Sequence, residues 1–286
     1  MVMRSYNDDY IHLLKKILCN SIYEQEIHIT TEDVADCARS IDILRASKPW
    51  VFEQYKQITA ESLAAILAYT KKNRNVHTYV SRLGLDNIEA CARDVVVNDI
   101  PGDFIDAGTL RGGTAILMRG ILRAYSDYTR NVVVADSFQG IPNPTIRDSI
   151  FDREIWFSLA DVLPQYNLLC IESLERVREN FSVYGLLDRQ VEFLPGWFSE
   201  TLSGLCDRQF SLIRIDVDWY ESVRDVLRLL YPMLSDGGYI IIDDYKLVGC
   251  KRAVDEFRVN NKIFDKISVS DEKSGIIFWK KMARKT

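Results

Sequence analysis

The sequence predicts an α/β protein in which a doubly wound, Rossmann-like parallel sheet follows a helical N-terminal extension. From about Pro101 onward, short aliphatic runs alternate with segments of helical periodicity, the pattern of a parallel sheet covered by helices on both faces. Four of these runs end in aspartate, and a glycine-rich turn follows the first. Before Pro101, helical patterns occur without such runs.

The first third of the chain is predicted to be helical, with its apolar residues at helical spacing and a polar loop at 71–75. The three apolar groups are Tyr10, Leu13, Leu14, Ile17 and Leu18; Leu63, Ile66 and Leu67; and Leu85, Ile88 and Cys91. We therefore expect residues 1–98 to form a helical lid or oligomerisation region, and residues 99–286 to form a cofactor-binding domain.

The remainder is predicted to alternate strands with helices. Strands are expected at Phe104–Ile105, Val132–Val134, Val191–Leu194, Leu212–Ile215 and Tyr239–Ile242, and helices at about Gly113–Ala124, Ile171–Tyr184 and Ser222–Leu234. The pieces Phe264–Val269 and Gly275–Trp279 are separated only by residues 270–274. They predict two last strands that form a hairpin at one edge of the sheet.

Composition excludes several classes of protein. The chain has 286 residues, 47% of them hydrophobic, which is enough to bury a full core. Its formal charge of -5 argues against a nucleic-acid partner, and a mean hydropathy of -0.10 without a long apolar run argues against membrane insertion. Acidic residues stand where a signal peptide would be apolar, so we expect a cytoplasmic protein. The six cysteines form no CxxC pair, which predicts reduced thiols and no zinc site.

The turn after the first predicted strand indicates a nucleotide-like cofactor. Gly108 allows a tight turn, and Gly112 and Gly113 open a helix whose N-terminal amides face the ligand. Asp136, at the end of the next strand, is placed to accept hydrogen bonds from ribose hydroxyls. The spacing G-x-x-x-G-G differs from the dinucleotide motif G-x-G-x-x-G, and so favours S-adenosylmethionine over NAD.

Four strand ends carry six carboxylates, and four of these belong to two strands that we expect to be neighbours. The four are Asp216, Asp218, Asp243 and Asp244. Carboxylates this close repel each other unless one holds a proton or a cation lies between them, and Mg²⁺ is the divalent ion that oxygen ligands favour here. The alternative is that these residues cap helices, or that Asp216 pairs with Arg214 or Arg224.

A cofactor pocket beside a metal held by carboxylates suits the transfer of a methyl group to a hydroxyl. An alcohol is a poor nucleophile, and a metal on its oxygen lowers its pKa while a neighbouring carboxylate takes the proton. The methyl group must lie in line between sulfur and oxygen, so positioning supplies much of the rate. Hydride transfer to a nicotinamide needs no such metal. An oxidoreductase and a non-catalytic binding module remain the two alternatives.

The motifs from about His77 to Phe257, and more faintly back to Tyr10, resemble the macrocin O-methyltransferase family. The matching runs are His77-Thr78-Tyr79, Leu85-Asp86-Asn87-Ile88, Pro101-Gly102-Asp103-Phe104, Arg111-Gly112-Gly113, Ala135-Asp136-Ser137-Phe138-Gln139-Gly140-Ile141-Pro142, Gly196-Trp197-Phe198, Asp216-Val217-Asp218-Trp219-Tyr220-Glu221-Ser222, Gly237-Gly238-Tyr239 and Asp243-Asp244-Tyr245. The resemblance implies a class I methyltransferase fold and an enzyme that uses S-adenosylmethionine and Mg²⁺ to methylate sugar hydroxyls of natural products. A homo-oligomer is also expected.

The resemblance also implies roles for individual residues. Asp216, Asp243 and Asp244 would be metal ligands, and Asp218 would be the general base. The residues implied in cofactor binding are Tyr79, Ser81, Asp106, Gly108, Thr109, Gly112, Asp136, Ser137, Trp197 and Phe198, with the segment Thr78 to Ser81 closing over the pocket. His77 is either structural or catalytic, and the Trp197-Phe198 pair either belongs to the core or lines an adenine site.

The chain departs from the family pattern at four positions. Asp106 and Leu110 stand where the family usually has Glu and Trp, and Val217 and Trp219 stand where it usually has Gly and Leu. Val217 and Trp219 lie beside the predicted acceptor site, and the catalytic acids are retained, so these departures bear on the identity of the acceptor more than on the reaction.

Overall fold

The computed structural model describes residues 6–21, 29–54, 59–61, 63–64, 76–162 and 170–283, and it has the predicted α/β fold. The strands, in the order in which they lie in the sheet, are β3 (Val191–Pro195), β2 (Val132–Asp136), β1 (Asp103–Ala107), β4 (Phe210–Ile215), β5 (Leu234–Ile242), β7 (Ile276–Lys280) and β6 (Ser268–Asp271). The first five are parallel, whereas β7 and β6 are antiparallel to their neighbours. The order reverses after β3 and resumes at β4 beside β1, as in a class I methyltransferase sheet.

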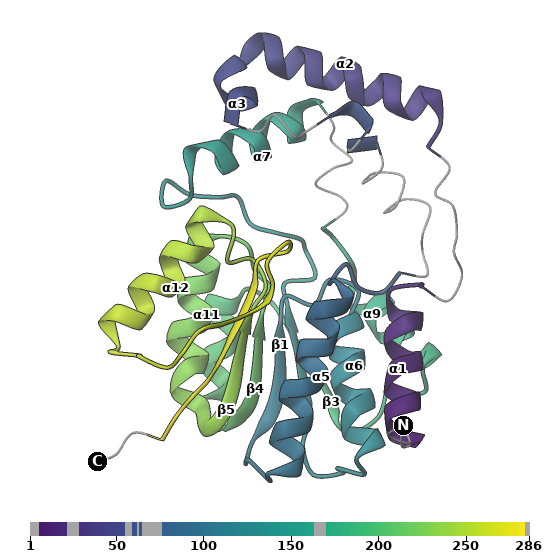
Figure 1. Ribbon diagram of the computed structural model, residues 1–286, viewed down its shortest axis with the longest axis vertical. Helices are drawn as coiled ribbons and strands as arrows, with labels where there is room; N and C mark the ends of the chain where they lie inside the picture. The colour runs from purple at the N-terminus through teal and green to yellow at the C-terminus, as the bar shows by residue number, and fades with distance from the viewer. Residues whose placement is uncertain are drawn as a thin grey trace.

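Helices cover both faces of this sheet (Figure 1). One face packs against α1 (Tyr6–Leu18), α5 (Arg82–Val97), α6 (Gly113–Ala124) and α9 (Leu174–Val183), and the other against α10 (Phe198–Thr201), α11 (Tyr220–Leu230) and α12 (Val248–Asn260). A third group, α2 (Thr31–Ser47), α3 (Pro49–Gln54) and α7 (Ile150–Val162), lies beyond the carboxyl ends of the strands (Figure 1). Short 3₁₀ turns occur at Leu202–Leu205 and Tyr231–Met233.

Alternating strand residues build two cores, one on each side of the sheet. In β1, Phe104 points into the core beneath α5 and α6, whereas Ile105 points into the core beneath α11 and α12. Both side chains are fully buried. Successive side chains of a strand point to opposite faces, so a strand covered on both faces is mostly apolar, and the buried Asp106 of β1 and Arg214 of β4 are exceptions.

The predicted N-terminal helix is present, but its buried face was predicted wrongly. Of the expected stripe, Leu14 and Leu18 are buried, while Leu13 is 51% exposed. Ile11 joins the buried face instead. The reason is the partner helix: α1 packs on α6 at Gly120, where an added Cβ would lie 2.3 Å from a methyl carbon of Leu14. The side chain of Leu14 therefore fills space that only glycine leaves open.

Other element boundaries shift by a few residues. The helix predicted to end at Leu234 passes earlier into a 3₁₀ turn that contains Pro232. Leu234 already belongs to β5. The predicted edge hairpin is present, but its first strand begins at Ser268, and Phe264 is exposed. Leu63 is buried as expected. Ile66, Leu67 and the predicted loop at 71–75 lie outside the described residues.

The six cysteines are free thiols, of which Cys37, Cys91 and Cys250 are buried. Within the described ranges, none of the helices combines the length and the apolar character needed to cross a bilayer.

Candidate active site

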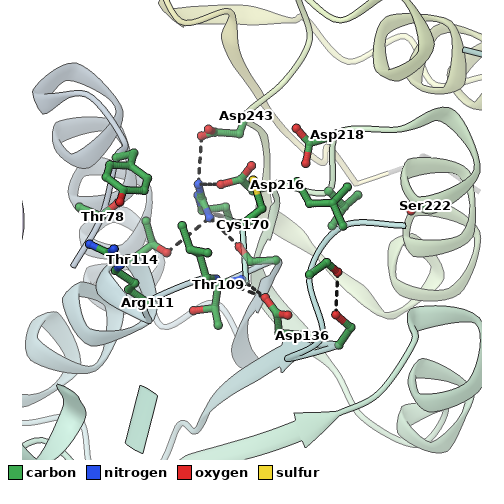
Figure 2. Close-up of a pocket in the computed structure, with 18 of the residues that line it drawn as sticks. Thr78, Thr109, Arg111, Thr114, Asp136, Cys170, Asp216, Asp218, Ser222 and Asp243 are labelled. Atoms are coloured by element: carbon green, nitrogen blue, oxygen red, sulfur yellow. Dashed lines mark hydrogen bonds and ion pairs between the residues drawn. The ribbon is translucent and has the colours of Figure 1, made fainter. Parts of the chain in front are cut away.

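A cavity of about 290 Å³ opens at the carboxyl ends of β1, β2, β4 and β5. Figure 2 shows its acidic side chains, with Asp216 near Asp243 and Asp218 and with Asp136 at the opposite end. The predicted site residues that line it are Tyr79, Gly108, Thr109, Asp136, Ser137, Trp197, Phe198, Asp216, Asp218 and Asp243. Ser81, Asp106, Gly112 and Asp244 were predicted with them but do not line this cavity.

The glycine turn after β1 has a shape that side chains would prevent. Gly108 has φ +85°, and a Cβ on it would lie 1.8 Å from the backbone oxygen of Asp216. Gly112 also has φ +85° and caps the N-terminus of α6, where a Cβ would lie 2.8 Å from Val177. The turn therefore needs glycine in order to pass close to the end of β4.

Asp106 supports this turn from within the protein. Its side chain is fully buried, and its two oxygens accept hydrogen bonds from the hydroxyls of Thr109 at 3.0 Å and Thr114 at 2.6 Å and from the Arg214 guanidinium at 2.9 Å. The carboxylate of Asp106 therefore lies behind the cavity wall, where these three donors satisfy it. It acts on the cavity only through Thr109, Thr114 and Arg214, which line it.

Asp136 holds the same turn from the end of β2. One of its oxygens accepts hydrogen bonds from the amides of Thr109 at 2.9 Å and Leu110 at 3.2 Å, and the other accepts one from Phe138 at 2.8 Å. Burial raises the pKa of Asp136, while the three amides act to lower it. Each carboxylate oxygen has two lone pairs, so the oxygen that accepts only from Phe138 keeps capacity for one more hydrogen bond.

The segment before α5 forms part of the cavity wall and is fixed to the start of α6, directly after the glycine turn. The carbonyl of His77 accepts a hydrogen bond from the Gly113 amide at 3.0 Å, and a Cβ on Gly113 would lie 2.3 Å from that oxygen. His77 Nδ1 lies 2.6 Å from the Tyr184 hydroxyl. Burial, with the nearby charge of Arg111, lowers the pKa of His77 to about 4. His77 is thus neutral near pH 7 and occupied by a structural contact.

Tyr79 and Ser81 belong to the same segment but lie in different surroundings. Tyr79 lines the cavity, and its ring lies 5.4 Å from the Arg111 guanidinium. Ser81 instead caps α5: its hydroxyl accepts a hydrogen bond from the Gly84 amide at 3.1 Å and donates one to Asp271 at 2.6 Å. Ser81 thus fixes where α5 begins and does not contact the cavity.

Carboxylates from the ends of β4 and β5 meet as the sequence predicted. Asp216, Asp243 and Asp244 each offer an oxygen atom, and these atoms lie within 4.8 Å of one another. Burial and the neighbouring carboxylates raise the pKa of Asp243 to about 7 and that of Asp244 well above its usual value. Such a cluster is stabilised either by protons or by a cation.

A buried arginine already supplies one positive charge to the cluster. Arg214 is 1% exposed, and its guanidinium lies 2.6 Å from a carboxylate oxygen of Asp216 and 3.1 Å from one of Asp243. The alternative that Asp216 pairs with Arg214 is therefore observed, whereas Arg224 pairs with Glu221 and Asp225. One guanidinium shared with Asp106 cannot neutralise every carboxylate around it, so the donor set still fits a hard divalent ion.

Asp218 lies beside this cluster but faces the cavity. Its amide donates a hydrogen bond to Asp244 at 3.2 Å, and its backbone has φ +56°. Burial and the charges of Asp216 and Asp243 raise its pKa to about 7. A carboxyl group with this pKa can accept a proton near neutral pH.

The sequence analysis assigned no role in the site to several residues of the cavity wall, namely Thr114, Ile141, Pro142, Cys170 and Ser222. Arg214 was considered only as a partner of Asp216, and its bond to Asp106 was not expected. An arginine inside an otherwise apolar strand was the signal for such a buried ion pair.

Trp197 and Phe198 line the cavity as predicted for an adenine site, and both are partly exposed. Phe198 also packs against the core beneath α11, so the core contact that the sequence left open is observed for Phe198, while adenine binding by the pair stays a prediction.

Comparison with known proteins shows where this chain belongs. The family model described as macrocin-O-methyltransferase (TylF) matches residues 7–281. The chain is 39% identical over 276 residues, 96% of this chain and 94% of its relative, to the 8-demethyl-8-(2,3-dimethoxy-alpha-L-rhamnosyl)-tetracenomycin-C 4'-O-methyltransferase of Streptomyces olivaceus. It is 37% identical to the demethyldecarbamoylnovobiocin O-methyltransferase of Streptomyces niveus, over 95% of this chain and 93% of that one.

Two solved methyltransferase structures have folds similar to that of this chain. The O-methyltransferase NovP matches with a TM-score of 0.74 and 36% identity, over 97% of this chain and 100% of that one. The calicheamicin methyltransferase CalS11 shares the fold at 18% identity, with a TM-score of 0.52 over 90% of this chain and 97% of that one. The chain is an enzyme of the O-methyltransferase class and belongs to the macrocin-O-methyltransferase family.

Proposed function

We propose that this enzyme transfers a methyl group from S-adenosylmethionine to a sugar hydroxyl of a small natural product, with Mg²⁺ bound at its carboxylate cluster. The observation that carries the proposal is one cavity lined by the glycine turn after β1 and by two of the three candidate metal ligands, Asp216 and Asp243. This arrangement would bring a methyl donor and a hydroxyl acceptor together. The substrates named for the relatives are hydroxyl-bearing natural products of this kind.

The cofactor half of the proposal rests on residues around the glycine turn. When bound, S-adenosylmethionine supplies the activated methyl group. Gly108 and Thr109 offer backbone close to the ligand, and Asp136 keeps acceptor capacity for ribose hydroxyls. Trp197 and Phe198 provide a partly apolar wall suited to the adenine ring. Asp106, Gly112 and Ser81 would act from behind this wall, by fixing the turn and the start of α5.

The metal half rests on Asp216, Asp243 and Asp244, which would hold Mg²⁺ through their oxygens. When bound, the metal lowers the pKa of the acceptor hydroxyl. Arg214 holds two of the three carboxylates in place and balances part of their charge. Asp218 faces the cavity with a raised pKa and would accept the hydroxyl proton on its carboxylate.

The helices beyond the strand ends suggest an enclosure for the acceptor. We propose that α2 and α3, together with α7, restrict access to the acceptor side of the cavity, in line with the lid expected for the N-terminal region. We also propose that the enzyme works as a homo-oligomer in the cytoplasm, and light scattering coupled to size-exclusion chromatography tests the oligomeric state.

A panel of acceptors tests the proposed reaction. Two panel compounds are those in the names of the relatives above, 8-demethyl-8-(2,3-dimethoxy-α-L-rhamnosyl)-tetracenomycin C and demethyldecarbamoylnovobiocin. The third is mycinamicin III, named for a further relative, the mycinamicin III 3''-O-methyltransferase of Micromonospora griseorubida, which is 36% identical over 96% of this chain and 96% of that one. Each is incubated with the enzyme, S-adenosylmethionine and MgCl₂, and the products are analysed by mass spectrometry. We expect a single added methyl group on at least one of them. Calorimetric titration that detects NADH binding but no S-adenosylmethionine binding would contradict the proposal and favour an oxidoreductase.

A further inference from the structure

The candidate base lies in a strained turn. The amide of Trp219 donates a hydrogen bond to the carbonyl of Val217 at 2.7 Å, and Asp218 lies between them with φ +56°. This is a three-residue γ-turn whose central residue has a positive φ, which is the rare and strained form of this turn. Such a conformation persists only where the surroundings enforce it.

The residue that follows the turn is anchored on two sides. Trp219 is almost fully buried, and its indole N–H donates a hydrogen bond to the carbonyl of Pro142 at 2.8 Å. Its ring meets that of Trp156 edge to face, with the centroids 5.6 Å apart. Trp156 in turn donates a hydrogen bond to the side chain of Asn143 at 3.1 Å. Two indoles thus hold the segment 142–143, and Pro142 lines the cavity.

The same contacts connect the turn to the layer beyond the strand ends. Trp156 belongs to α7, which also contacts α2 and α3. Within that layer, Glu154 of α7 forms an ion pair with Lys48, and Phe151 lies 5.6 Å from Trp50, measured between ring centroids. Helix α7 therefore connects the outer helices to the residue next to Asp218, through side-chain contacts on both of its sides.

We propose that Trp219 is a positioning residue, which holds Asp218 in its strained conformation and ties it to Pro142 and α7. This inference rests on the proposed function, in which Asp218 is the base. Trp219 does not itself line the cavity, so it acts through its two neighbours that do, Asp218 and Pro142. Loss of the indole contacts frees the turn to relax, and the carboxylate of Asp218 then leaves its working position.

The variant that tests this inference is Trp219→Phe, which keeps an aromatic ring but loses the bond to Pro142. The matched control is Trp279→Phe: Trp279 is 1% exposed in β7, and its indole N–H has no hydrogen-bond partner among the described residues. We expect Trp219→Phe to lower kcat on the accepted panel compound by about tenfold or more, while the Kd for S-adenosylmethionine stays within about twofold. Trp279→Phe should leave kcat close to that of the wild type.

Two further readouts separate positioning from general loss of structure. In the Asp218→Asn background, Trp219→Phe should cause little further loss of kcat, because both changes act on the same group. Hydrogen exchange should become faster at the amides of Asp218 and Trp219 in Trp219→Phe and stay unchanged in Trp279→Phe. Fully additive losses, or unchanged exchange at these amides, would overturn the inference. If the wild type methylates no panel compound, the proposed reaction fails, and the exchange comparison still tests the anchoring.

Discussion

Asp216 and Asp218 leave the same strand end but meet different surroundings. Asp216 accepts a hydrogen bond from Arg214 at 2.6 Å, which holds its carboxylate toward Asp243. Asp218 follows two residues later, and its positive φ turns its carboxylate toward the cavity. At the residue scale, this difference in neighbours is the reason why we propose metal binding for Asp216 and proton transfer for Asp218.

The proposed base is tested by Asp218→Asn, which keeps the shape of the side chain and removes its basicity. We expect kcat to fall by roughly 10²- to 10⁴-fold, because general-base catalysis contributes about that much. The Kd for S-adenosylmethionine, measured by calorimetry, should change by less than about threefold, because the proton is transferred only during the reaction. A variant that turns over at the wild-type rate would remove Asp218 from this role.

The raised pKa of Asp243 predicts how stability depends on pH in the metal-free protein. The folded state holds the proton more tightly than the unfolded state, so this residue contributes stability below about pH 4, and the contribution is lost as the pH rises through about 7. In EDTA, the free energy of unfolding measured with urea should therefore fall from pH 5 to pH 8 more steeply for the wild type than for Asp243→Asn. If the free energy of unfolding fell equally with pH in the two proteins, the raised pKa of Asp243 would be contradicted.

At the scale of elements, α1 shows how a helix can carry two apolar stripes of which only one is buried. Ile11, Leu14 and Leu18 pack toward α6, while Leu13 remains exposed one residue away from Leu14. Periodicity alone could not choose between the stripes, because both have helical spacing. The choice depends on Gly120 of α6, which is distant in sequence and leaves room for Leu14.

The burial of this helix predicts opposite outcomes for two adjacent leucines. Leu14→Ala should lower the free energy of unfolding by about 2–5 kcal/mol, because it leaves a cavity against α6. Leu13→Ala, the matched control on the exposed side, should change it by less than about 0.5 kcal/mol. Urea denaturation followed by circular dichroism measures both. A larger loss for Leu13→Ala would mean that the two faces of α1 had been exchanged.

At the scale of the whole molecule, the parallel sheet explains why so much of the site could be predicted. Parallel strands end at one edge, so residues that follow separate strands, such as Asp136, Asp216 and Asp243, converge without any local signal. What could not be predicted depends on side-chain packing across strands. Arg214 of β4 reaches Asp106 of β1, which draws that carboxylate behind the cavity wall.

The most direct test of the proposed reaction is the initial rate of methyl transfer to the accepted panel compound, followed by mass spectrometry, first in EDTA and then after addition of excess MgCl₂. We expect almost no transfer in EDTA and full recovery with Mg²⁺, because Arg214 alone cannot neutralise the carboxylates of Asp216, Asp243 and Asp244. The same rate with and without EDTA would contradict the metal role.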